Sequence, residues 1–397
     1  MTQIKHYELG ELADVTKLAG FEFTKYIKYN NYGKIIALRA LNLRHGELDL
    51  TDIKRIDRSV SELLPRSKLY INDILLTYTG NGYGDCAIIE ENDKYHLAPN
   101  ICKIAPNVEK VVPYYLYSYI RTNEFYKIMS SHMTGSSQPT IPMKTIRVLP
   151  IPLPPIVVQE KIAEVAYCIN EKIRKNNAIN KNLEQQAQAI FSNEFLTLET
   201  LPDGWKQSSL IDIADYLNGL AMQKYRPTAG ETGIPVLKIK ELRQGCCDDN
   251  SELCSPNIKS EYIIHDGDVI FSWSGSLLVD FWCGGICGLN QHLFKVTSNK
   301  YDKWFYYAWT KHHLDRFIAV AADKATTMGH IKRDELSKAE VLIPNEADYK
   351  RIGYLLQPIY DLIIANRIEN KKLAEARNTL LPKLMSGEID ISEVDYE

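Results

Sequence analysis

Hydrophobic and polar positions follow the same order twice along this chain of 397 residues. Each half begins with short runs rich in β-branched residues, which predict strands. An aromatic-rich helix is predicted next, over residues 113–129 and again over 303–321. Prolines then interrupt the pattern, at residues 149–155 and at Pro344, because the residue before a proline disfavours helical backbone. The predicted strands are GKIIALRAL, DILLTYT, CAIIE and NICKI, then IPVLKIKEL, DVIFSWS and HLFKV.

The two halves also match in sequence. The offset is 199 residues between Leu18 and Leu217, 195 between NDILLTYTG and GDVIFSWSG, and 192 between the aromatic segments PYYLY and FYYAW. It falls to 190 between residues 135–154 and residues 325–344. Small deletions in surface loops explain this drift. The constant order of the matches favours a tandem duplication over chance similarity of apolar runs.

A long helix is predicted after each proline segment. Apolar residues and asparagines alternate three and four residues apart, which is the heptad pattern of a coiled coil. Pro358 lies inside the second helix, and we expect it to kink that helix or delay its start. The heptad positions are Ile162, Ala166, Ile169, Ile173, Asn176, Asn180, Leu183, Ala187 and Ile190, then Ile352, Leu356, Ile359, Ile363, Asn366, Asn370, Leu373 and Leu380.

Asparagines occupy equivalent positions in the two helices. Asn176 and Asn180 correspond to Asn366 and Asn370, 190 residues later. A buried asparagine fixes register, because it pairs well only with a polar partner at the same height. If the helices pack antiparallel, these amides meet near the centre of the pair. Alternatively, each helix packs on its own domain and the asparagines face water.

These patterns predict an α+β protein with a pseudo-two-fold internal repeat. Two tandem α/β domains, residues 1–155 and 201–345, are joined by helical spacers at residues 156–200 and 346–397. The spacers form an antiparallel coiled coil in this prediction. A helix of about 34 residues is ~50 Å long. Such a spacer would place two globular domains roughly one to one and a half turns of duplex DNA apart.

Composition is that of an ordinary globular protein, with 45% hydrophobic and 24% charged residues. The net charge of −3 excludes a strongly basic protein that coats DNA, so any nucleic-acid surface must be a local patch. No run reaches transmembrane length and the first residues do not resemble a signal peptide, so we expect a cytoplasmic protein without membrane contact. The eight cysteines are then expected to be reduced thiols, and we expect no metal or cofactor because paired CxxC spacing is missing.

Sequence motifs of catalysis are also missing. An amino-methyltransferase needs an Asn/Asp-Pro-Pro-aromatic loop, whereas Pro154-Pro155 follows Leu153. The segment GNGYG (80–84) lies between predicted strands rather than opening a helix, and no GxxxxGK[ST] nucleotide loop is present. We therefore expect no catalytic residues.

Several segments together resemble one known family. SWSGS and WCGGICGLNQHLFKV within residues 272–296, then TTMGHIKRDEL, a proline and a long helix, resemble the specificity subunit of type I restriction–modification systems. LPDGW (201–205), GSSQPTIP and LPIPLPPIVVQEKI are also similar to that family. TYTGNGYGDCAI departs from the SWSGS pattern, so we expect the two domains to recognise different bases.

This resemblance implies a non-catalytic subunit that binds a bipartite, asymmetric site in double-stranded DNA. It implies two target-recognition domains and two helical spacers, with two modification (methyltransferase) subunits and two restriction subunits as partners. It also implies DNA methylation at adenine N6. The alternative is a coiled-coil adaptor whose two domains bind protein or carbohydrate.

Base recognition needs amide, hydroxyl and basic side chains on loops that enter a groove. The basic segment 44–68 fits phosphate contacts, or equally a solvated surface. Motifs shared by both domains can instead maintain the fold, and we favour turn geometry for Gly80, Gly275, Gly135 and Gly329. The DNA-binding candidates are Lys54, Arg55, Arg58, Tyr78, Thr79, Asn81, Tyr83, Ser136, Ser137 and Gln138 in the first domain, and Trp273, Ser274, Ser276, Asn290, Gln291, His292, Thr326, Thr327, His330 and Lys332 in the second.

Overall fold

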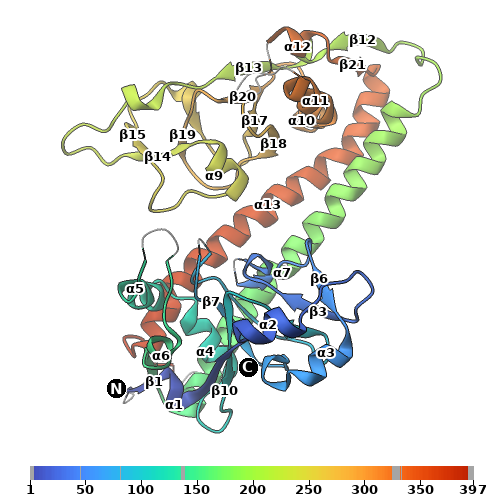
Figure 1. The fold of residues 1–397 in the computed structure, drawn as a ribbon. Coiled ribbons are helices and arrows are strands. Elements are labelled where there is room, and N and C mark those ends of the chain that lie inside the picture. Colours follow the sequence, from blue (N-terminus) through green and yellow to red (C-terminus); the bar gives the residue numbers. More distant parts are fainter. Residues whose placement is uncertain are drawn as a thin grey trace. The chain divides into compact units, whose positions relative to one another are not determined.

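The computed structural model describes residues 4–44, 46–80, 82–135, 139–323, 331 and 333–391. The chain divides into two compact units, Met1–Glu171 with Ala374–Glu397, and Lys172–Leu373 (Figure 1). Each unit contains part of the two long helices, α7 (Ile156–Phe191) and α13 (Glu346–Met385). No helix among the described residues is long and apolar enough to cross a membrane.

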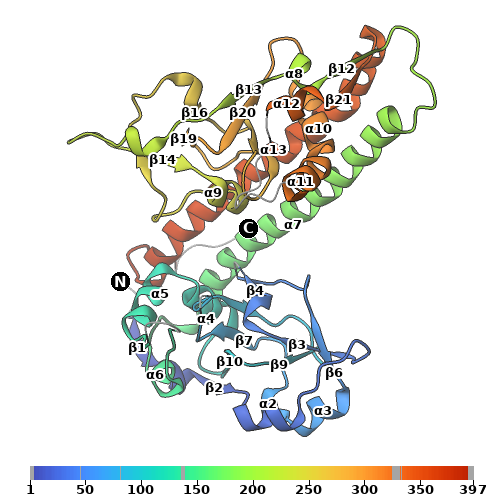
Figure 2. The ribbon, with the colours of Figure 1, turned by 45° about the horizontal axis from the view of Figure 1, so that its top comes forward.

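The first unit contains mixed helices and short strands. Its elements are β1 (Lys5–Glu8), α1 (Leu9–Leu12), β2 (Ala13–Lys17), α2 (Gly20–Tyr26), β3 (Ile35–Leu38), β4 (Leu43–Arg44), β5 (Glu47–Leu48), β6 (Lys54–Ile56), α3 (Arg58–Leu63), β7 (Ile74–Thr77), β8 (Cys86–Ile88), β9 (Tyr95–Leu97), β10 (Ile101–Pro106), α4 (Pro113–Ile120), α5 (Asn123–Ser131), α6 (Met143–Arg147) and β11 (Pro150–Leu153). Its main sheet has the order β2-β10-β7-β8, and a second sheet has the order β6-β3-β9 (Figure 2).

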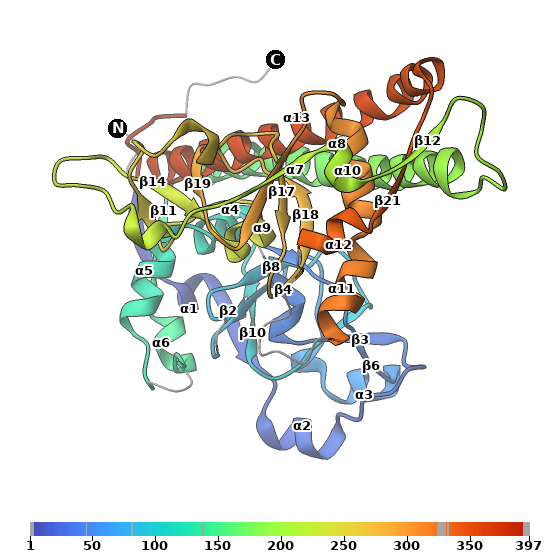
Figure 3. The same cartoon turned by 90° about the horizontal axis from the view of Figure 1, so that it is seen from above.

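The second unit repeats this topology. Its elements are β12 (Lys206–Ser209), α8 (Leu210–Ile213), β13 (Asp215–Asn218), β14 (Ile234–Leu237), α9 (Ile239–Gln244), β15 (Leu253–Cys254), β16 (Ile263–Ile264), β17 (Val269–Ser272), β18 (Leu278–Phe281), β19 (Cys287–Leu289), β20 (Leu293–Thr297), α10 (Lys303–His312), α11 (Leu314–Asp323), α12 (Arg333–Ser337) and β21 (Glu340–Ile343). The order β13-β20-β17-β18 corresponds strand by strand to β2-β10-β7-β8. Figure 3 shows the antiparallel strands β17 and β18 side by side.

Both units also share a parallel strand pair. In the first unit β3 pairs in parallel with β9, and in the second β14 pairs in parallel with β19. The strand before each main sheet pairs with the strand before the long helix, β1 with β11 and β12 with β21. This agreement confirms the predicted tandem repeat of two α/β domains.

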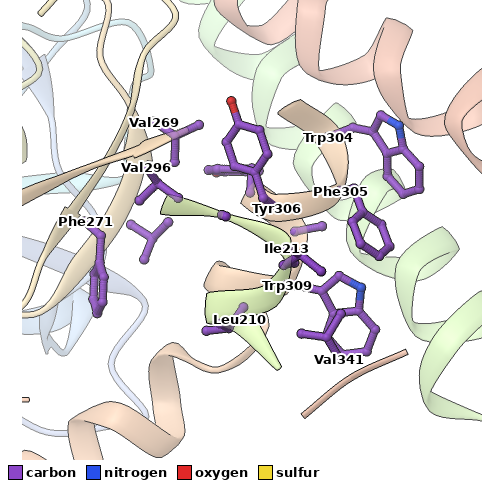
Figure 4. Close-up of a cluster of buried hydrophobic side chains, with 14 of the residues drawn as sticks. Leu210, Ile213, Val269, Phe271, Val296, Trp304, Phe305, Tyr306, Trp309 and Val341 are labelled. Carbon is purple, nitrogen blue, oxygen red and sulfur yellow. The ribbon is translucent and has the colours of Figure 1, made fainter. Parts of the chain in front are cut away.

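The aromatic helices supply the core of each unit. Figure 4 shows Trp304, Phe305 and Trp309 of α10 gathered with aliphatic residues such as Leu210 and Val341. In the first unit, Tyr115, Tyr117 and Tyr119 of α4 are equally buried. Burying each aromatic ring contributes roughly 1.5–3 kcal/mol. The helical spacing of these aromatics therefore marks the core.

Each predicted aromatic helix is two helices in the structure. In the first unit the helix ends after Ile120, and Thr122 caps the next one by accepting a hydrogen bond from the Phe125 backbone N–H at 3.2 Å. Thr122 is a good N-cap residue, and its signal was outweighed by the continuous aromatic pattern. The strand predicted over IPVLKIKEL ends at Leu237, because Glu241 accepts a hydrogen bond from the Lys238 N–H and starts α9.

The predicted effect of Pro358 on the start of its helix is wrong. The helix α13 begins at Glu346 and continues through Pro358 to Met385. The carbonyl that loses its hydrogen-bond donor belongs to Tyr354, four residues earlier, whose side chain is 83% exposed. Water can hydrate this carbonyl, so the proline is tolerated on the outer face of the helix.

The two long helices pack antiparallel, as predicted. Within the second unit, Asn176 donates a hydrogen bond to Asn370 at 2.9 Å, and Asn366 donates one to Asn180 at 2.8 Å. Partners on α13 move toward its N-terminus as positions on α7 move toward its C-terminus. The alternative in which the asparagines face water is excluded for Asn176 and Asn180, which are 2% and 5% exposed.

Candidate nucleic-acid interface

The turns that follow the two central strands, β7 and β17, carry most of the described candidates. In the second unit the indole Nε1 of Trp273 donates a hydrogen bond to the side chain of Asn218 at 3.0 Å. The Trp273 ring lies 5.6 Å from that of Phe294 and 6.3 Å from that of His292. Ser274 Oγ and His292 Nδ1 are 3.1 Å apart. The β17–β18 and β19–β20 turns are therefore joined through side chains.

The β19–β20 turn adds the remaining candidates. The backbone N–H of His292 donates to the side chain of Asn290 at 3.2 Å, and Gln291 Nε2 lies 3.4 Å from His292 Nε2. Ser274 and Asn290 are only 1% and 6% exposed, whereas Trp273, Gln291 and His292 are half-buried. The buried pair can orient the cluster, and the half-buried side chains remain able to contact a ligand.

Ser276 plays a different part in the same turn. Its side chain is exposed, while its backbone carbonyl accepts a hydrogen bond from Ser272 Oγ at 2.9 Å. Gly275 has a φ of +65°, which supports the predicted turn role because side chains disfavour that backbone conformation. Gly80 and Gly135 also have positive φ values of +87° and +89°. Gly329 lies outside the described residues.

The first unit has an equivalent turn with different chemistry. Thr79 is buried and its hydroxyl lies 2.6 Å from that of Thr140. The Lys17 ammonium lies 5.2 Å from the centre of the Tyr78 ring, within the range of a cation–π contact. Tyr78 and Lys17 remain available to a ligand, whereas Thr79 joins the turn to the segment at Thr140.

Tyr83 packs on Tyr126 with ring centres 5.3 Å apart. The Tyr126 hydroxyl donates a hydrogen bond to the Tyr83 oxygen. Burial, followed by this hydrogen bond, raises the pKa of Tyr126. The phenol of Tyr126 therefore stays protonated at neutral pH and fixes the position of the Tyr83 ring.

Strand register makes these two sites equivalent. Lys17 pairs with Cys102 in the first unit, and Asn218 pairs with Phe294 at the same place in the second. The Ile141 N–H donates to the Tyr78 carbonyl at 3.0 Å, and the Ile331 N–H donates to the Trp273 carbonyl at 3.1 Å. Lys17 with Tyr78 therefore corresponds to Asn218 with Trp273.

Sequence reasoning missed Lys17 and Asn218. The match of Leu18 with Leu217 implied an offset of 199 residues, which aligned Lys17 with Tyr216. The strand register gives an offset of 201 at this point. The signal was present in the polar residue that ends β2 and β13, but the two-residue difference concealed it.

The basic candidates lie on another sheet. Lys54 and Arg55 belong to the edge strand β6, and Arg58 begins α3. Lys54 and Arg58 are exposed, while Arg55 is half-buried with its guanidinium 3.5 Å from the carbonyl oxygen of Gly33. The structure therefore separates this patch in topology from the Tyr78 turn.

Eight further candidates lie outside the described residues: Asn81, Ser136, Ser137, Gln138, Thr326, Thr327, His330 and Lys332. Within the described ranges, no group of three or more His, Cys, Asp and Glu side chains is arranged to hold a metal ion.

Comparison with known proteins identifies the family. The model of the type I restriction modification DNA specificity domain matches the chain twice, over residues 1–197 and 202–376. The MjaIX specificity subunit of Methanocaldococcus jannaschii is 26% identical over 309 residues, which are 72% of this chain and 71% of that protein. The HindI specificity subunit of Haemophilus influenzae is 20% identical, covering 98% of this chain and 100% of that protein.

A solved structure has the same fold. The type I restriction-modification S subunit from M. genitalium covers 96% of this chain and 96% of its own, with a TM-score of 0.56 and 13% sequence identity. The two family matches together span most of the 397 residues and coincide with the two topological repeats. The chain therefore belongs to the family of type I restriction–modification DNA specificity subunits, which are non-catalytic components that recognise DNA.

Proposed function

We propose that the chain recognises a bipartite, asymmetric site in double-stranded DNA, with one half-site contacted by each unit. The observation that supports this most directly is the substitution of Lys17 and Tyr78 by Asn218 and Trp273 at equivalent places. A lysine presents only donors, whereas an asparagine amide presents both a donor and an acceptor. Equivalent positions with different hydrogen-bonding groups favour different bases in the two half-sites.

In this proposal Trp273, Gln291 and His292 contact the second half-site, and Ser274 and Asn290 orient them. Tyr78, Lys17 and Tyr83 contact the first half-site, while Thr79 maintains its turn. The exposed side chains of Lys54 and Arg58 contact phosphates, which contributes affinity without base discrimination. The remaining candidates in the segments 136–138 and 326–332 stay proposals on the basis of sequence alone.

The antiparallel helices α7 and α13 set the spacing between the half-sites in this account. Asn176, Asn180, Asn366 and Asn370 fix the register of the pair through the hydrogen bonds described above. A change in register by one heptad would place these amides against apolar residues, which is unfavourable. The spacer length in the DNA is therefore a property of the number of helical residues.

We further propose two modification subunits and two restriction subunits as partners, in the cytoplasm, where they would methylate adenine N6 at the recognised site. The chain itself supplies DNA recognition and recruits these partners. The repeated topology supports two copies of one partner, because two equivalent surfaces can bind two identical chains.

Sequencing the methylated positions in the DNA of a host that expresses this chain with its modification subunit tests the proposal. The expected result is one new motif with two different half-sites separated by unspecified bases. A continuous motif, or no new methylation, would contradict it. A catalytically inactive modification subunit is the control. The adaptor alternative predicts no DNA binding at any salt concentration, whereas phosphate contacts give binding that weakens steeply with salt.

A further inference from the structure

A cavity of about 430 Å³ in the first unit is lined by two arginines that the DNA-recognition function does not use. Arg121 lies at the end of α4 and Arg377 on the C-terminal part of α13. Three side-chain amides, Asn123, Asn170 and Asn378, line the same cavity. Its other lining residues are Ser118, Thr122, Glu124, Lys127, Leu381 and Pro382.

The Arg377 guanidinium has only neutral partners among the described residues. It donates to Asn170 Oδ1 at 2.7 Å and to Asn378 Oδ1 at 3.1 and 3.2 Å. Burial and then the positive charge of Arg121 lower the pKa of Arg377. A buried cation beside a second cation is unfavourable unless an anion compensates it.

Neighbouring side chains fix both arginines in position. Asn170 also donates to the Tyr114 hydroxyl at 3.0 Å, so it joins Arg377 to α4. Arg121 donates to the Tyr117 hydroxyl at 3.0 Å. A side chain at Gly46 would collide with the Arg121 guanidinium, because its Cβ would lie 2.2 Å from Arg121 Cζ. The two donors are therefore positioned before any ligand binds.

The repeat shows that the fold does not need Arg377. The second unit has an equivalent cavity, lined by Lys311 and Ala308 in the places of Arg121 and Ser118. There the positions of Arg377 and Asn170, 190 residues away, are occupied by the buried Ala187 and Tyr360. One copy of the unit thus completes the same junction with apolar side chains, and only the first copy places a second cation in it.

We infer that the cavity bounded by Arg121 and Arg377 binds a small phosphate ester. Guanidinium groups match phosphate oxygens in geometry, and the cavity volume falls in the range of small-molecule sites. The amides and the apolar side chains of Leu381 and Pro382 then contact the organic part of the ligand. The volume excludes a DNA duplex. The exposed carboxylate of Glu124 at the same cavity opposes dense negative charge, which favours a monoester over a triphosphate.

Calorimetric titration of the full chain with AMP, inorganic phosphate and adenosine tests this inference. We expect saturable binding of AMP, at least tenfold weaker binding of inorganic phosphate, and none of adenosine. Arg377→Leu and the surface substitution Lys127→Glu each weaken AMP binding at least tenfold. Lys311→Met, in the equivalent cavity of the second unit, leaves it unchanged.

Thermal unfolding separates a binding role from a structural one. Without ligand, Arg377→Leu is expected to unfold at the same or a higher temperature than the natural chain, because it removes a buried charge. AMP is expected to raise the unfolding temperature of the natural chain and not that of the variant. Failure of AMP to bind the natural chain, or binding that survives both Arg377→Leu and Lys127→Glu, would overturn the inference. Neither result bears on the DNA motif.

Discussion

Asn366 donates a hydrogen bond to Asn180 between α13 and α7, and the repeat-related residues Asn176 and Asn370 make the same contact one helical turn away. The 190-residue offset maps one pair onto the other, because Asn176 corresponds to Asn366 and Asn180 to Asn370. The pseudo-two-fold axis of the repeat therefore passes between the two pairs.

Replacing one member of a pair should cost more stability than replacing both. Asn180→Leu leaves the buried Asn366 amide without its acceptor and is expected to lower the free energy of unfolding by about 1–3 kcal/mol. The double variant Asn180→Leu/Asn366→Leu should recover most of this loss, since two leucines pack in an apolar seam. Denaturant unfolding followed by circular dichroism measures both, with the exposed Lys175→Ala as control. Additive losses in the double variant would show that the amides act independently.

Removing the His292 imidazole should affect one half-site only. His292 contacts Ser274 and lies beside Trp273, so His292→Ala removes a candidate base contact and loosens the turn. Losing one base contact costs about 1–3 kcal/mol, which corresponds to roughly 5- to 150-fold weaker binding. Competition binding with duplexes altered in either half-site, in the presence of the modification subunit, measures this effect. Equal loss of discrimination at both half-sites would contradict the assignment, and Gln186→Ala on the exposed face of α7 is the control.

The basic patch should change affinity without changing sequence preference. Lys54→Ala and Arg58→Ala each remove one exposed positive charge. If each contacts one phosphate, each lowers the slope of log affinity against log salt by about 0.9. Binding titrations across a series of salt concentrations measure the slope, and Lys372→Ala, an exposed lysine on α13, is the control. An unchanged slope would mean that the patch is a solvated surface.

Periodicity predicted the long elements of this protein well. The heptad positions of α7 and α13 and the order of strands followed from spacing alone, because apolar faces must be buried at helical or strand intervals. Local hydrogen bonds were harder to predict. The Thr122 cap and the Glu241 contact with Lys238 each ended an element inside an apolar pattern. Pro358 was misjudged because tolerance of a proline depends on which side of the helix faces water.

The candidate site was predicted in part for the same reason. Trp273, Ser274 and His292 belong to motifs that the sequence displays, and the structure brings them together. Lys17 and Asn218 belong to no motif, and their equivalence follows from strand pairing across more than 70 residues. Contacts of this kind depend on register in three dimensions, which a single sequence does not specify.

The central claim is that paired helices set the distance between two half-sites, and lengthening both helices tests it most directly. Three heptads inserted after Ala178 and three after Ile368 keep both asparagine pairs and add about 32 Å. This length is close to one turn of duplex DNA, so both half-sites keep their rotational phase. Methylome sequencing should then show the same two half-sites with a spacer longer by about nine or ten base pairs. A methylated motif whose spacer is unchanged would contradict the claim.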